Sequence, residues 1–159
     1  MNLHEDIDRI KQVMGINETF DAGVEPTLKD TYEEGGAKVY SYVIPSKKSE
    51  EEYIIKLKFY KEFKDPKIKD TYKDVMVIDF NLGAGSYYNT NLNEVFYIFA
   101  SINKLIEKYK KKFQYLMGYS NKDRLSLYKK ALSRASYLEL VDEGTHHIIY
   151  KNKDYSRWF

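Results

Sequence analysis

The stretch Val75-Met76-Val77-Ile78-Asp79-Phe80 is an apolar run typical of a buried strand, and the rest of the chain is organised around it. A glycine-containing loop, Leu82-Gly83-Ala84-Gly85-Ser86, follows this run. From Asn91 to about Lys112, apolar residues then recur every three or four positions: Leu92, Val95, Phe96, Phe99, Ile102, Ile106 and Tyr109. The stretch therefore predicts a strand, a loop and an amphipathic helix that lies on a sheet.

The residues after this helix predict one more strand, one more helix and a hairpin. Residues 113–119 form the next apolar run, and the helix before them makes this strand parallel to the strand at 74–81. Ser120 to Asp123 cap a second helix, whose buried face consists of Leu125, Tyr128, Ala131, Leu132 and Ala135. Two strands at 137–141 and 145–151, joined by Asp142-Glu143-Gly144, close the domain.

In the residues before the opening stretch, apolar and polar side chains alternate with a period of two. Residues 39–44 and 53–60 predict two strands that form an antiparallel meander with the strand at 74–81. We divide the chain into an amphipathic N-terminal helix at 1–18, a linker or arm with one short strand at 19–36, a domain at 37–151 and a tail at 152–159. The predicted fold class is α+β with a mixed sheet.

Composition excludes several classes of protein. The 159 residues are 43% hydrophobic and 31% charged, which is typical of one globular domain. A net charge of +2 gives no global field that would recruit nucleic acid or an anionic membrane. The chain has no cysteine, no apolar run long enough to span a membrane, and acids where a secretory signal would be basic. We expect an intracellular protein or one packaged in a particle.

The order of predicted elements resembles the fold of the GCN5-related N-acetyltransferase (GNAT) family over residues 37–151. Asn121 at the start of the second helix, with Tyr128 seven residues on and Leu127 directly before it, is similar to a pattern in that family. The resemblance implies that the strands at 74–81 and 113–119 splay around the pantetheine arm of acetyl-coenzyme A. It also implies that backbone N–H groups of a glycine-rich turn hold the pyrophosphate.

The resemblance suggests a role for each candidate site residue. Tyr128 would be the general acid, Asp79 or a nearby water the general base, and Asn121 a hydrogen-bond donor to the cofactor arm. Gly83, Ala84 and Gly85 would form the pyrophosphate turn. However, no Arg or Gln precedes these glycines, and Ser86 to Thr90 separate them from the helix cap. The alternative for Tyr128 is a core aromatic, for Asn121 a helix cap, and for the glycines a plain loop.

Two other groups of residues invite a functional interpretation. Lysines between Lys108 and Lys112 could contact phosphates, but basic residues at a helix C-terminus also suit the helix dipole. We expect a solvated face there and no nucleic-acid partner. His146 and His147 point to opposite faces of a strand, so we expect no metal site.

The N-terminal residues resemble the leaders of proteins from large tailed phages. Ile16-Asn17-Glu18 matches the preference of prohead proteases, and the alternative is a plain helical arm. The stretch from Asn91 onward is also loosely similar to the N-terminal domain of T-even phage internal ADP-ribosyltransferases. Trp158 and Phe159 could anchor the tail to a neighbour, such as a second copy of the chain.

From these observations we expect a phage-encoded, GNAT-like protein without catalytic activity or cofactor. It would bind a virion or host protein, in the virion interior or the host cytoplasm. The alternative is an active N-acetyltransferase that uses acetyl-coenzyme A, with Tyr128 as the general acid.

Overall fold

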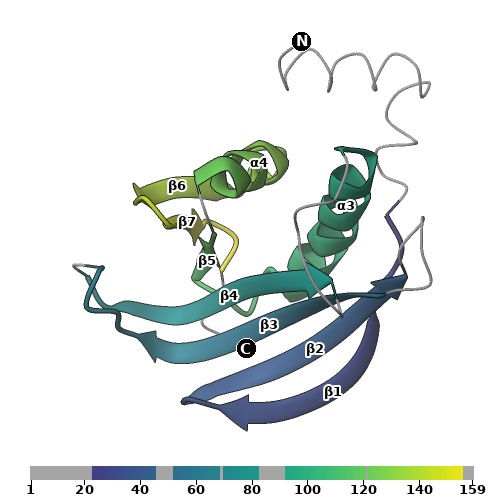
Figure 1. The fold of residues 1–159 in the computed structure, drawn as a ribbon. Helices are drawn as coiled ribbons and strands as arrows, with labels where there is room; N and C mark the ends of the chain where they lie inside the picture. Colours follow the sequence, from purple (N-terminus) through teal and green to yellow (C-terminus); the bar gives the residue numbers. More distant parts are fainter. Residues whose placement is uncertain (1–22, 46–51, 69, 83–91, 121, 156–159) are drawn as a thin grey trace.

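The computed structural model describes residues 23–45, 52–68, 70–82, 92–120 and 122–155. Seven strands and two helices make up these residues (Figure 1). In chain order they are β1 (Thr27–Glu34), β2 (Ala37–Pro45), β3 (Glu52–Phe63), β4 (Tyr72–Leu82), α3 (Leu92–Tyr109), β5 (Tyr115–Tyr119), α4 (Lys122–Leu132), β6 (Leu138–Glu143) and β7 (His147–Asn152). The helix and leader expected at 1–18 and the anchor at Trp158 and Phe159 lie outside the described residues.

The seven strands form one mixed sheet in the order β1-β2-β3-β4-β5-β7-β6. Every neighbouring pair is antiparallel except β4 and β5, which are parallel and joined through α3. A parallel pair needs such a crossover, because the chain must return to the same end of the sheet. The expected α+β class is confirmed. Neither described helix has the length and apolarity of a membrane span.

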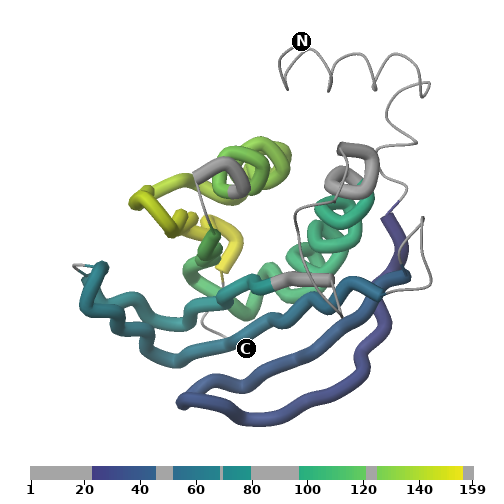
Figure 2. Tube along the Cα trace, in the orientation of Figure 1, coloured from purple at the N-terminus to yellow at the C-terminus, as the bar shows by residue number. Residues whose placement is uncertain are grey.

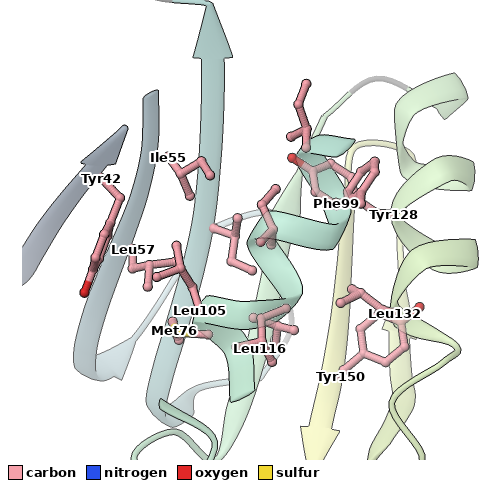
Figure 3. Packing of buried hydrophobic residues seen from close by; sticks show 14 of the residues in the cluster. Tyr42, Ile55, Leu57, Met76, Phe99, Leu105, Leu116, Tyr128, Leu132 and Tyr150 are labelled. Carbon is pink, nitrogen blue, oxygen red and sulfur yellow. The ribbon is translucent and has the colours of Figure 1, made fainter. Parts of the chain in front are cut away.

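Both described helices cover the same face of the sheet, which we call the helix face (Figure 1). Phe99, Ile102 and Ile106 of α3 are buried there, as the helical spacing predicts. Tyr128 and Leu132 of α4 face the same core, together with Leu116 of β5 and Tyr150 of β7 (Figure 3). The alternate residues of β2, β3 and β4 complete this core from below: Tyr42, Ile44, Tyr53, Ile55, Leu57, Met76 and Ile78.

Part of the opposite face of the sheet, at β4, β5 and β7, is covered by a connecting segment. Residues 64–71 join β3 to β4, and we call them the strap. Ile68 of the strap is buried against Val75, Val77, Met117 and Ile149. We call this side the strap face. A turn in which the Ile68 N–H donates to the Asp65 carbonyl, at 2.9 Å, folds the strap back on itself.

Asp74 interrupts the alternation of β4 where the strap rejoins the sheet. It has a φ of +53°, the left-handed conformation that Asp tolerates better than most residues. Beyond it, Tyr72 packs edge to face on Tyr115 at 4.8 Å, on the same face as Val75. The Tyr155 hydroxyl donates to the Asp74 carboxylate, and the Gln114 N–H donates to the Asp74 carbonyl. Asp74 therefore turns the β3–β4 hairpin toward the strap face.

Within the stretch expected to be a linker with one short strand, the structure contains β1, which pairs with β2 along its length. Gly35 and Gly36 form the two-residue turn between them, both with positive φ (58° and 82°). Such a turn matches the twist of paired strands. Most β1 side chains are exposed, so the strand lacks the apolar alternation on which strand prediction depends.

The C-terminal hairpin is shifted toward the C-terminus relative to the sequence-based boundaries. Asp142 and Glu143, expected in a turn, are the last residues of β6, and β7 extends to Asn152. Asn152 was placed in the tail, yet it is buried and donates from Nδ2 to the carbonyl of Phe113, at 2.7 Å. Its partners are backbone groups from distant parts of the chain, so no local pattern indicates this role.

Candidate functional site at the β4–β5 junction

The centre of the sheet contains a point where β4 and β5 stop pairing. Their parallel register runs from Val75 opposite Tyr115 to Ile78 opposite Gly118. Beyond Ile78, β4 continues to Leu82 and remains paired with β3. The chain after β5 turns toward β7, where the Ser120 N–H donates to the His146 carbonyl at 3.0 Å. Among the described residues, the last part of β4 thus has a strand on one side only.

Gly118 lies on the helix face at this junction. A Cβ added there would lie 3.5 Å from Cγ1 of Ile148, which is ordinary van der Waals contact. Core packing therefore does not require glycine at this position. Because glycine has no side chain, it leaves more space on the helix face of the junction than an alanine at this position would.

Tyr128, the predicted general acid, is a core residue. Its exposed fraction is 4%, and its ring packs edge to face on Phe99 with centroids 5.0 Å apart (Figure 3). The helical spacing that brings Leu125 and Leu132 into the core also buries Tyr128. This packing matches the structural alternative for the residue.

Asp79, the predicted base, lies on the other side of the sheet. It is exposed, and it stands opposite Lys56 in the β3–β4 register. Successive side chains of a strand alternate between faces, so Asp79 shares the strap face with Val75 and Val77. Tyr128 lies on the helix face. The structure does not bring the two predicted catalytic residues together on one face.

The predicted cofactor-binding residues Gly83, Ala84, Gly85 and Asn121 lie outside the described residues. Within the described ranges, no three His, Asp or Glu side chains are grouped so that they could hold a metal ion. Of the predicted site residues that the structure describes, Tyr128 is buried on the helix face and Asp79 is exposed on the strap face.

Two hydrogen-bonded pairs on the strap face were not anticipated from the sequence. The Tyr119 hydroxyl donates to Oδ2 of Asp65 at 3.3 Å, and burial, followed by the Asp65 charge, raises the pKa of Tyr119. Nε2 of His147 lies 3.2 Å from Oδ2 of Asp142. A Cβ on Gly144 would lie 2.2 Å from Cε1 of His147, so the ring requires a glycine there. The Tyr119–Asp65 pair fastens the strap to β5. The His147–Asp142 pair fastens β7 to β6.

The outer strand β6 exposes two adjacent apolar side chains. Leu140 is 38% exposed and Val141 is 44% exposed. The register with β7 shifts between Leu140 and Asp142, which leaves Val141 as the extra residue of a bulge. No described strand pairs with the outer side of β6 (Figure 1). This edge is the clearest apolar contact surface that the sheet offers a strand from a partner.

Comparison of the chain with protein-family models and with curated protein sequences gave no match.

Proposed function

We propose that the chain is a GNAT-like protein that acts by binding a protein partner and not by transferring an acyl group. The strand order, with β4 and β5 as the one parallel pair of the described sheet and α3 as their crossover, supports the GNAT-like part of this proposal. The absence of an Arg or Gln before Gly83 supports the non-catalytic part.

The burial of Tyr128 is the observation that carries the proposal. A general acid must lie within hydrogen-bond reach of the leaving group, here the thiolate of coenzyme A. Tyr128 is 4% exposed and packed on Phe99, so its ring fills the core. The edge-to-face contact with Phe99 gives this ring a packing role that needs no substrate, and this supports the non-catalytic part of the proposal.

The outer edge of β6 is the proposed contact with the partner. An extended peptide can add to such an edge through main-chain hydrogen bonds, and its side chains then contact those of the edge strand. Leu140 and Val141 supply the apolar contact. Glu139, exposed on the same strand, favours a partner segment that combines apolar and basic residues.

Calorimetric titration with acetyl-coenzyme A tests the non-catalytic part of the proposal. We expect no heat of binding and no rise in melting temperature, because a ligand that binds only the native state must stabilise it. Micromolar binding would contradict the proposal.

A pair of matched variants tests the proposed edge. Leu140→Asp should abolish capture of the partner from host extract or from disrupted particles. Leu28→Asp is the control, because Leu28 is 48% exposed on β1 and lies at the far edge of the sheet. Equal capture by both variants would exclude β6 as the contact.

An active N-acetyltransferase is the second candidate function. The observation that favours it is the unpaired side of β4 beyond Ile78, where the GNAT resemblance places the cofactor arm. This function predicts that acetyl-coenzyme A raises the melting temperature and that Tyr128→Phe lowers turnover of an amine acceptor. The Phe variant preserves the ring that packs on Phe99.

The proposal includes a tailed-phage origin, with the protein in the virion interior or the host cytoplasm. The leader-like sequence before Thr19 supports it. Mass spectrometry of assembled particles tests this part: a chain that begins after Glu18 supports packaging with cleavage, and an intact Met1 in particles excludes the cleavage.

A further inference from the structure

Three aromatic rings from separate elements meet where the C-terminal end of α3 crosses the meander. Tyr40 of β2, Phe59 of β3 and Tyr109, the last residue of α3, have centroids 5.3 to 5.8 Å apart. All three residues are partly exposed. We call these three rings the aromatic platform.

The aromatic platform is held in place from beneath. Tyr40 and Phe59 are on neighbouring strands whose register is continuous from Lys38 to Pro45. The hydroxyl of Tyr109 forms a hydrogen bond with the hydroxyl of Tyr42, which is almost fully buried. Burial, followed by this hydrogen bond, raises the pKa of Tyr109, so its hydroxyl stays neutral. The three rings are therefore held against the core, with their planes inclined at 39° to 89° to one another.

The ammonium groups of three lysines lie over the two tyrosine rings of the aromatic platform, as in cation–π contacts. Their Nζ atoms lie 5.4 Å (Lys38 to Tyr40), 5.8 Å (Lys108 to Tyr109) and 6.0 Å (Lys112 to Tyr109) from the ring centroids. Lys108 and Lys112 are at the end of α3, where the helix dipole favours cations, but Lys38 is on a strand, where no such effect operates.

No carboxylate of the described residues lies within ion-pair distance of these three lysines. Glu33 stands opposite Lys38 in the β1–β2 register without forming an ion pair. Glu107, next to Lys108 in sequence, instead contacts Lys110 and accepts a hydrogen bond from Tyr137. Among the described residues, these three lysines therefore have no ion-pair partner.

We propose that the aromatic platform and its three lysines bind single-stranded nucleic acid. Bases of a single strand have free π faces that can stack on Tyr40 and Tyr109 when Lys38, Lys108 and Lys112 turn from the ring faces to the phosphates. A duplex hides its base faces and cannot use the rings in this way. The binding is independent of the proposed partner contact, which lies on β6 at the far edge of the sheet.

This inference changes the interpretation of the Lys108–Lys112 segment. Considered alone, the segment is typical of a solvated helix end, and we expected no nucleic-acid partner from it. The structure adds Lys38 and two strand aromatics that are distant in the sequence. Alternating cations and partly exposed rings are the combination that tracks a single strand.

Fluorescence anisotropy with a labelled oligothymidylate of about 15 nucleotides tests the proposal. If three phosphates are contacted, the logarithm of the binding constant should fall with the logarithm of salt concentration with a slope of about −2. Replacing Lys38, Lys108 and Lys112 together with Gln should bring this slope close to zero. The control replaces Lys67, Lys130 and Lys153, which are exposed elsewhere, and should retain both slope and affinity.

The ring contribution needs its own variant. Tyr40→Leu keeps an apolar side chain but removes a stacking surface, so binding should weaken about tenfold while the salt slope stays unchanged. Tyr109→Phe keeps all three rings and removes only the hydrogen bond to Tyr42, so it should weaken binding less than Tyr40→Leu does. Thermal melting of each variant establishes that the fold is intact before binding is compared.

Four results would overturn the proposal. The first is no binding to the oligonucleotide at low salt. The second is equal loss of affinity in the platform and control lysine variants, which would indicate only net charge. The third is a duplex of the same length binding as tightly as the single strand. The fourth is polyglutamate competing as well as the unlabelled oligonucleotide, which would identify a general anion patch.

Discussion

The two faces of the sheet are closed in different ways. On the helix face, two amphipathic helices cover a core of large side chains, with Leu105 and Ile102 at its centre. On the strap face, one short connection supplies Ile68, and partly exposed aromatics surround the smaller cluster: Tyr60, Phe63, Tyr72 and Tyr115. Apolar strand residues are thus buried by two helices on the helix face, and by one residue of a connecting segment in the cluster on the strap face.

This difference indicates which part of the molecule is cooperative and which part can open by itself. The helix face joins residues from β2 to β7, so losing it unfolds the domain. The strap is fastened by Ile68, by the turn at Asp65 and by the Tyr119–Asp65 hydrogen bond. Because these contacts of the described strap residues involve one buried side chain and an exposed hydrogen bond, we expect a low free energy of local opening for the strap.

The largest effect is expected on the helix face. Leu105→Ala should lower the free energy of unfolding by about 4 kcal/mol, because Leu105 is fully buried and α3 cannot collapse into the cavity. Urea unfolding measures the change, and near-UV and far-UV circular dichroism should report a single transition. Loss below 1 kcal/mol would show that the helix face is not the main core.

A smaller effect is expected on the strap face. Ile68→Ala should cost about 2 kcal/mol, because the strap can settle onto the sheet after truncation. Amide exchange should accelerate in the strap and leave α3 unchanged. Acceleration of the same size in both regions would contradict the distinction between the two faces.

Asp74 tests how the strap is attached. Asp74→Ala should cost about 1.5 kcal/mol, because Ala resists a positive φ and loses the hydrogen bond from Tyr155. Asp74→Gly should cost less, since glycine accepts this φ without strain. Tyr155→Phe removes the same hydrogen bond and leaves the backbone unchanged, so the three urea midpoints separate the two causes.

The smallest effect is confined to alkaline pH. Burial, followed by the Glu143 charge, raises the pKa of Tyr150 to about 12, from an ordinary value near 10. The native state therefore holds this proton more tightly than the unfolded state does. The resulting stability is fully present below pH 10 and is lost as the pH rises from 10 to about 12.

Matched phenylalanine variants show how much of this loss of stability at alkaline pH comes from the helix face and how much from the strap face. Tyr150→Phe on the helix face and Tyr119→Phe on the strap face should each reduce the fall in the urea midpoint above pH 10. Below pH 9 their pH dependence should match that of the parent protein. A parent midpoint that does not fall between pH 10 and 12 would contradict the raised pKa values.

The helices and the central strands could be predicted because their signal is periodic. The spacing of Phe99, Ile102 and Ile106 identified the buried side of α3, and Leu125 and Leu132 did the same for α4. The parallel pairing of β4 with β5 followed from the crossover between them. In each case a repeated local pattern carries the information.

What could not be predicted depends on contacts between distant residues. The exposed strand β1 has no apolar alternation, although Gly35-Gly36 is a hairpin signal that could have indicated it. The Tyr119–Asp65 pair, the role of Asn152 and the convergence of Lys38 with Tyr109 are visible only in three dimensions. For Tyr128, one spacing fits both a catalytic and a core role, and only the structure shows that its ring packs on Phe99.

The Gly35–Gly36 turn has a practical consequence for labelling the protein. A Cβ added to either glycine would meet no atom within 4 Å, so the tip of the β1–β2 hairpin projects into solvent (Figure 2). Hairpin tips of this kind tolerate inserted sequence when the flanking register is kept. An epitope or a fluorophore-acceptor peptide placed between Gly35 and Gly36 would therefore report the protein's location in particles or cells while leaving the β6 edge uncovered.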